Sequence, residues 1–184
     1  MAMTVYTIGH STRSIESFIR MLRTHAIKKV VDIRAIARSR HNPQYNEDEL
    51  KRSLGSEDIE YVHCPGLGGL RHTTKASINT GWRNASFRGY ADYMQTPQFQ
   101  ENLARLIDIV REKKTAILCA EAVPWRCHRS LVADALSVRG ITVLDILGET
   151  GVRPHALTPF AEIHGTKITY PGTGFAPGTK CDGY

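Results

Sequence analysis

The chain has 184 residues, which suits one domain whose hydrophobic core is large enough to fold without disulfides or metal. Hydrophobic residues make up 41% of it and charged residues 23%, a globular composition that excludes disordered and fibrous proteins. The formal net charge of +6 favours ligands that carry phosphate, on nucleotides, nucleic acid or acidic lipid, although many basic domains bind none of them.

No stretch approaches the roughly 18 apolar residues of a membrane span, and residues 1–10 lack the basic region and apolar core of a signal peptide. Four cysteines are too few for a disulfide scaffold in a chain of this length. We therefore expect a cytoplasmic protein with free thiols and no membrane partner. No pattern specifies a cofactor or an oligomeric state.

Strands and helices are predicted to alternate along the chain. Apolar and β-branched runs indicate the strands, and apolar residues at helical spacing indicate the helices. In chain order these patterns predict a strand at 4–8, a helix at 15–22, a strand at 29–34, a helix at 47–54, a strand at 59–64, a helix at 96–113, a strand at 115–119, a helix at 127–139 and a strand at 141–146. Ser14 or Thr12 is the candidate N-cap of the first helix, and Gly140 is a normal stop for the last.

Two segments between these elements are expected to be loops. Residues 38–43 form a basic loop, and residues 71–89 are polar and too long for an ordinary connection, which favours a functional or covering loop. The alternation predicts a three-layer α/β/α fold with a mostly parallel sheet of about five strands. We expect a single domain over residues 1–172 and a Gly-, Pro- and Thr-rich tail over 173–184.

Polar side chains follow the ends of four predicted strands. Parallel strands end at the same edge of a sheet, and ligands of open α/β sheets bind at that edge. We therefore expect one site built from several strand exits, which carry His10, Ser11, Asp32, Arg34, Cys64, Gly68, Gly69, Cys119 and Glu121.

Cys127, His128 and Arg129 stand at the predicted start of a helix. Unpaired N–H groups there attract anions and lower the pKa of a thiol, so Cys127 could be a thiolate nucleophile with His128 as proton carrier. Arg129 could bind a phosphate or carboxylate with two hydrogen bonds. The alternative is that Cys127 is a small buried hydrophobe and that His128 and Arg129 simply cap the structure.

Cys119 lies eight positions before Cys127, so a loop could bring the two thiols together. They could act as nucleophile and resolving thiol, ligate a metal, or pack as ordinary side chains. A zinc ion wants about four ligands, which Cys119, Cys127, His128 and either His10 or Cys64 could supply. Because the spacing matches no common zinc pattern, we predict no metal ligand.

The acidic residues at the strand exits have more than one interpretation. Asp32 and Arg34 point to the same face of a strand, where they form either a structural ion pair or part of a catalytic centre. Glu121 is a candidate general base, a partner for Arg129, or a solvated loop residue. The pair Gly68-Gly69 would let the backbone approach a ligand closely, which is a weak indication alone.

Arginines and aromatic residues are interleaved around the two predicted loops. They would supply cations and stacking surfaces together, as nucleotide pockets and nucleic-acid grooves do. A solvated basic face is the alternative. The set comprises Arg34, Arg38, Arg40, His41, Arg71, His72, Arg83 and Arg88, with Tyr45, Trp82, Phe87, Tyr90 and Tyr93.

Several motifs occur together in this chain: Thr7-Ile8-Gly9-His10-Ser11, Asp32-Ile33-Arg34, Arg38-Ser39-Arg40-His41-Asn42-Pro43, Leu67-Gly68-Gly69, Phe87-Arg88-Gly89-Tyr90-Ala91-Asp92-Tyr93-Met94, Cys119-Ala120-Glu121 and Cys127-His128-Arg129. Jointly they resemble the uncharacterised family called domain of unknown function 488, over about residues 4–172. Ala37 departs from the pattern, because related sequences carry a proline there. The resemblance implies no settled activity, although the paired cysteines suggest an enzyme. It marks as signature positions His10, Asp32, Arg34, Cys119, Glu121, Cys127, His128 and Arg129.

The leading hypothesis is a thiol-containing enzyme that acts on a phosphate-bearing ligand, a nucleotide or nucleic acid. The candidate catalytic residues are Cys127, Cys119, His128, Glu121, His10 and Asp32. The candidate ligand-binding residues are Ser11, Arg34, Arg38, Gly68, Gly69, Tyr90 and Arg129. The rival hypotheses are a nucleic-acid-binding module without chemistry and a metal-binding protein with Cys and His ligands.

Overall fold

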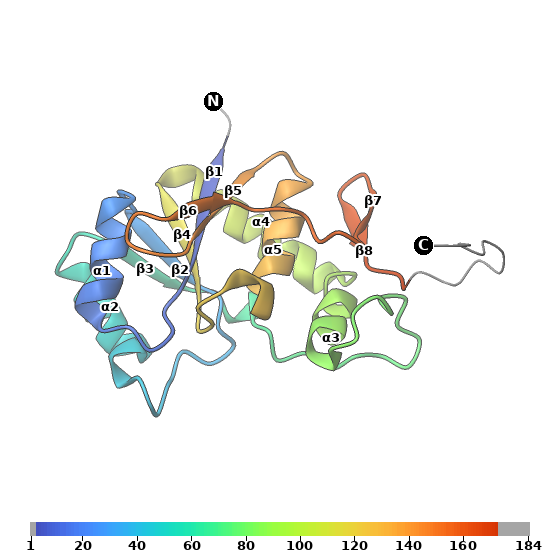
Figure 1. The fold of residues 1–184 in the computed structure, drawn as a ribbon, viewed down its shortest axis with the longest axis horizontal. Helices are drawn as coiled ribbons and strands as arrows, with labels where there is room; N and C mark the ends of the chain where they lie inside the picture. Colours follow the sequence, from blue (N-terminus) through green and yellow to red (C-terminus); the bar gives the residue numbers. More distant parts are fainter. Residues whose placement is uncertain (1–2, 173–184) are drawn as a thin grey trace, which may run out of the picture.

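A computed structural model describes residues 3–172 of the chain (Figure 1). Its centre is a six-stranded sheet in the order β3-β2-β4-β1-β5-β6, in which the first five strands are parallel and β6 runs antiparallel to β5. The strands are β1 (Thr4–Gly9), β2 (Lys29–Asp32), β3 (Glu60–His63), β4 (Thr115–Cys119), β5 (Thr142–Ile146) and β6 (Val152–Pro154).

Helices cover both faces of this sheet, because its inner strands are apolar on both sides. Helices α1 (Ile15–Thr24) and α2 (Glu47–Gly55) pack on one face, and α3 (Ala85–Tyr93), α4 (Pro97–Glu112) and α5 (Arg129–Ser137) contribute to the core on the other (Figure 1). The predicted three-layer α/β/α fold with a mostly parallel sheet is confirmed.

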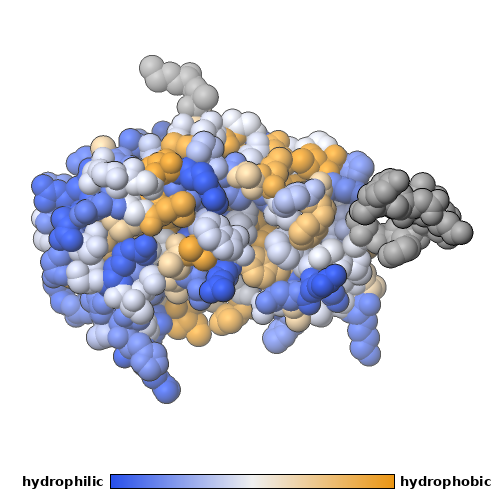
Figure 2. All heavy atoms as spheres, viewed as in Figure 1, coloured by the Kyte–Doolittle hydropathy of each residue, from blue (hydrophilic) through white to orange (hydrophobic). Residues whose placement is uncertain are grey.

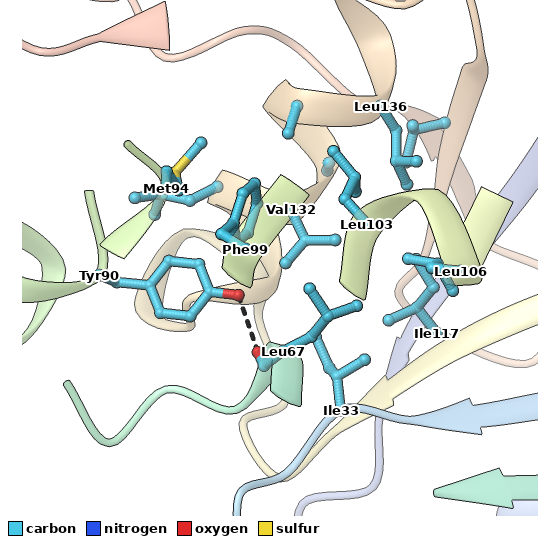
Figure 3. Close-up of a cluster of buried hydrophobic side chains, with 14 of the residues drawn as sticks. Ile33, Leu67, Tyr90, Met94, Phe99, Leu103, Leu106, Ile117, Val132 and Leu136 are labelled. Carbon is cyan, nitrogen blue, oxygen red and sulfur yellow. Dashed lines mark hydrogen bonds between the residues drawn. The ribbon is translucent and has the colours of Figure 1, made fainter. Parts of the chain in front are cut away.

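Alternation along the strands divides the core into two clusters. Val30 and Leu118 face α1 and α2, whereas their neighbours Val31 and Ile117 face the larger cluster shown in Figure 3. On the face of the molecule in Figure 2, hydrophobic side chains gather toward the middle, and the end over α1 and α2 is mainly hydrophilic.

The first helix begins as the sequence predicts, since the Ser14 side chain accepts a hydrogen bond from the backbone N–H of Ser17. The last begins later than predicted, at Arg129, because the turn Pro124–Arg126 precedes it. None of the helices between residues 3 and 172 combines the length and apolar character that crossing a membrane requires.

Helix α3 is a correction to the predicted loop at 71–89. Its sequence contains a glycine and several aromatic residues, which have modest helix propensity, but the Asn84 side chain caps its N-terminus. Asp92 on α3 accepts hydrogen bonds from Ser77 and Asn79, which tie the preceding loop to the helix. Strand β6 and the hairpin of β7 (Glu162–His164) and β8 (Lys167–Thr169) were also not predicted. The predicted tail at 173–184 lies outside the described residues.

Candidate functional site

A cavity of about 420 Å³ opens at the carboxyl edge of the parallel strands. It is lined from the ends of β1, β2 and β4, the loop after β3, helix α3 and the turn before α5. The predicted site residues among its lining are His10, Arg34, Arg38, Gly69, Cys119, Glu121, Cys127 and His128.

At the end of β1, the backbone lies very close to the backbone that follows β4. Gly9 pairs with Cys119 across the parallel ladder, and a Cβ on Gly9 would lie 1.7 Å from the carbonyl oxygen of Glu121. The backbone N–H groups of His10 and Ser11 then donate to the carbonyls of Cys119 and Ala120. Only glycine at position 9 lets these two strand exits run side by side.

Two thiols and an imidazole meet on one wall of the cavity. Nδ1 of His128 lies 3.9 Å from Sγ of Cys119 and 3.8 Å from Sγ of Cys127, and the three atoms lie within 4.8 Å of one another. The predicted return of the loop between the two cysteines therefore occurs in the structure.

The two thiols have opposite electrostatic environments. The hydrogen bond from Cys119 lowers the pKa of Cys127, and the nearby Arg129 guanidinium and backbone N–H act in the same direction against the effect of burial. That same interaction with Cys127, together with burial, raises the pKa of Cys119 well above its usual range. Of the two thiols, Cys127 therefore has the lower pKa and is the better candidate nucleophile.

The imidazole of His128 is fixed from three sides. Its Nε2 lies 3.4 Å from the carbonyl oxygen of Ile33, its ring centroid lies 4.9 Å from that of Tyr90, and Gly69 approaches it from the cavity loop. Because a carbonyl only accepts, Nε2 is the donor toward Ile33, and Nδ1 is the nitrogen that faces the two thiols. This geometry makes His128 the candidate proton carrier for Cys127.

Gly69→Ala is expected to lower the free energy of unfolding by about 1–3 kcal/mol, because the new Cβ would lie 2.4 Å from Nδ1 of His128. Gly55→Ala is the matched control: nothing lies within 4 Å of a Cβ at this end of α2, so a gain of about 0.5 kcal/mol is expected. Urea unfolding measures both. Equal effects of the two substitutions would contradict a fixed imidazole.

A buried arginine forms the cationic floor of the cavity. Nε and Nη2 of Arg34 donate to the carboxylate of Asp32, and Nη2 also donates to the carbonyl of Tyr45 at 2.8 Å. Tyr61 donates its hydroxyl to the same carboxylate at 2.9 Å. Asp32 is fully buried and does not line the cavity, so its oxygens orient Arg34 rather than face a ligand.

His10 completes this floor as a neutral ring. Burial lowers its pKa to about 4, and the hydrogen bond at 2.7 Å to the Ser11 carbonyl places the ring proton on Nδ1. Nε2 then accepts from Nη1 of Arg34 at 3.4 Å, and the ring stacks on Tyr45. His10 therefore positions Arg34 and adds no charge near neutral pH.

Four predicted ligand-binding residues lie outside the lining of this cavity. Arg129 is 1% exposed and donates to the carbonyls of Glu121 and Ala122 at 2.6 and 3.1 Å, so it holds the loop instead of facing the cavity. Tyr90 donates its hydroxyl to the carbonyl of Leu67 at 2.7 Å (Figure 3). Gly68 packs against Ala35, and the lining does not include Ser11.

Arg129 belongs to a buried cluster of charges behind the cavity. Its Nε donates to the hydroxyl of Thr7 at 3.2 Å, which donates to Asp145 at 2.6 Å. His155 lies between Asp145 and Asp134, with its Nε2 2.8 Å from the Asp134 carboxylate. Two carboxylates and two cations thus balance in the interior, and they anchor the loop that carries Glu121.

Several other residues that line the cavity were not predicted as site residues. Arg126 adds a cation from the turn before Cys127, and Ser39 and Phe87 belong to motifs of the family resemblance for which no role was predicted. Ile36 and Leu70 are 62% and 73% exposed, unusual values for large aliphatic side chains at a cavity. Their proximity to Arg38 and Gly69 in the sequence is the signal that could have found them.

Of the comparisons with known proteins, only the one with protein-family models gives a match. The family model described as Domain of unknown function DUF488 matches residues 14–136, more than half of the chain. No curated protein and no solved structure matches it. The segment contains the site residues from Arg34 to Arg129, whereas His10 precedes it. The chain belongs to the DUF488 family, a domain of unknown function.

Proposed function

We propose that this protein is a thiol-dependent enzyme that acts on a phosphate-bearing ligand, a nucleotide or nucleic acid. The observation that carries the proposal is the position of Cys127, whose sulfur lies beside a donor thiol and an imidazole in a cavity lined by Arg34, Arg38 and Arg126. A thiol with a lowered pKa forms the nucleophilic thiolate more readily than an ordinary thiol, and arginines are suited to bind phosphate oxygens.

The reaction proceeds in two steps, transfer of the ligand to Cys127 and hydrolysis of the resulting covalent intermediate. The sulfur of Cys127 attacks the electrophilic centre of the ligand, the bond to the leaving group breaks, and His128 returns to that group the proton that it took from the thiol. Glu121, an exposed residue of the cavity, then takes a proton from water, whose oxygen displaces the sulfur. Cys119 stabilises the departing thiolate by donating its S–H.

Iodoacetamide alkylation at graded pH tests the assignment of the nucleophile. Cys127 should react at pH values below the usual thiol pKa of about 8.5, and Cys119 only well above it. Cys64 is the internal control, since burial raises its pKa and it lies outside the cavity. Nucleoside monophosphate should slow alkylation of Cys127 alone. The proposal fails if all three thiols titrate together near 8.5.

A metal centre is the second candidate, and the donor set favours it directly. Two buried thiols and the lone pair of His128 Nδ1 converge, while Nε2 bonds a backbone carbonyl as the outer nitrogen of metal-bound histidines does. A zinc ion there would polarise a ligand or a water molecule. Elemental analysis of the alkylation samples decides between the thiol enzyme and the metal centre. If the protein contains stoichiometric zinc and Cys127 resists alkylation, Cys127 is a metal ligand and not a nucleophile.

A further inference from the structure

A second cavity, of about 250 Å³, shares a turn with the first. Within the turn Pro124–Arg126, Arg126 lines the thiol cavity, whereas its neighbour Trp125 lines the second cavity. Two stacked aromatic rings also connect the cavities. Phe87 lines the first cavity, Trp82 lines the second, and their ring centroids are 4.7 Å apart. A ligand that occupies one cavity therefore lies next to the other.

Aromatic and proline side chains make up much of the wall of the second cavity, which Arg153, Asp145 and His155 also line. Trp82 meets Phe160 edge-on at 4.9 Å, and both line the cavity. Trp125 is 54% exposed, and the guanidinium of Arg153 lies 5.1 Å from its ring centroid. An exposed tryptophan next to an arginine is the arrangement on which bases of single-stranded nucleic acid stack.

Two polar groups of residues that line this cavity have incomplete hydrogen bonding. The indole N–H of Trp82 has no hydrogen-bond partner among the described residues, but it is buried, so a ligand would reach it only after a local shift. The Ser130 hydroxyl donates to the Cys127 carbonyl, and its oxygen accepts no hydrogen bond from residues 3–172. A planar ring that carries both acceptors and donors at its edge could donate a hydrogen bond to the Ser130 hydroxyl, and a nucleobase is such a ring.

We propose that the second cavity binds a nucleobase of single-stranded nucleic acid, which stacks on Trp125 while the adjacent phosphate lies against Arg126. The placement of the phosphate rests on the proposed function, whereas base stacking on Trp125 does not. The formal net charge of +6 gives the strand a general attraction, and the aromatic walls select unpaired bases over a duplex, whose bases are already stacked.

Binding of a fluorescein-labelled single-stranded hexanucleotide, followed by anisotropy, tests the proposal without any turnover. Trp125→Ala should weaken binding about tenfold, equivalent to about 1.4 kcal/mol. Ile78→Ala, which removes another exposed apolar side chain outside both cavities, should leave binding unchanged. The effect of Trp125→Ala should persist at raised salt, whereas that of Arg126→Gln should shrink.

Intrinsic fluorescence gives an independent readout, because both tryptophans of the chain line this cavity. The unlabelled strand and adenosine should quench it, and inorganic phosphate should not. Equal affinity for a duplex of the same length, or no effect of Trp125→Ala, would overturn the base site even if Cys127 proves reactive. Conversely, quenching by adenosine with an unreactive Cys127 would keep the base site and reject the thiol enzyme.

Discussion

Asp134→Asn is expected to lower the free energy of unfolding by about 3–5 kcal/mol, because it leaves a buried cation without its closest partner. Asp134 is fully buried, lies 2.8 Å from Nε2 of His155, and also accepts hydrogen bonds from Thr158 and Tyr170. Urea unfolding measures the loss. Asp108→Asn, which breaks an exposed ion pair with Arg111, is the control and should cost less than about 0.5 kcal/mol.

The same cluster sets a pH dependence. Burial alone would lower the pKa of His155, but hydrogen bonds to Asp134 and Asp145 outweigh it and raise the pKa to about 9. Because the folded pKa exceeds the unfolded value of about 6.5, the stabilisation is full below pH 6.5 and is lost as the pH rises through 9. His155→Gln should flatten this decline. An unchanged slope between pH 6.5 and 9 would contradict a charged His155.

Arg34→Met should destabilise the protein by about 3–5 kcal/mol and, if the proposed function holds, abolish nucleotide binding. It leaves the fully buried carboxylate of Asp32 with hydrogen bonds from Tyr61 and the main chain but without its counter-charge. Arg38→Met is the matched control, because Arg38 is exposed on the same cavity and should change stability by less than about 0.5 kcal/mol.

A double substitution separates the two effects of Arg34. Asp32→Asn together with Arg34→Met removes both charges and keeps an oxygen for Tyr61, so more than half of the lost stability should return. Nucleotide binding should stay lost, as judged by protection of Cys127 from alkylation. If the double variant regains protection, Arg34 is structural and the anion binds elsewhere.

The sheet edge was predictable because it depends on topology and not on side-chain detail. Apolar strands that alternate with helices specify parallel pairing, and parallel pairing brings the ends of β1, β2 and β4 together. The convergence of Cys119 with Cys127 and His128 follows from the same rule, since one residue ends β4 and the others stand just before α5.

The direction in which each polar side chain points was not predictable. Arg34 and Arg129 both belong to motifs that the topology brings to the same edge of the sheet. Arg34 lines the cavity, whereas Arg129 donates hydrogen bonds to main-chain carbonyls behind it. The difference depends on Thr7, Asp145 and His155, which are distant from Arg129 in the sequence. Such partners become visible only when the chain is folded, because no local pattern records them.

The position of β1 in the sheet bears on the boundaries of the folding unit. The segment that matches the family ends before β5 and begins after β1, yet β1 lies between β4 and β5 and pairs with both. A fragment of residues 14–136 would therefore expose the long edge of β4 and retain Asp134 without His155. Truncation at the family borders should produce an aggregating chain, so the smallest autonomous form of this domain is longer than the segment by which its relatives are recognised.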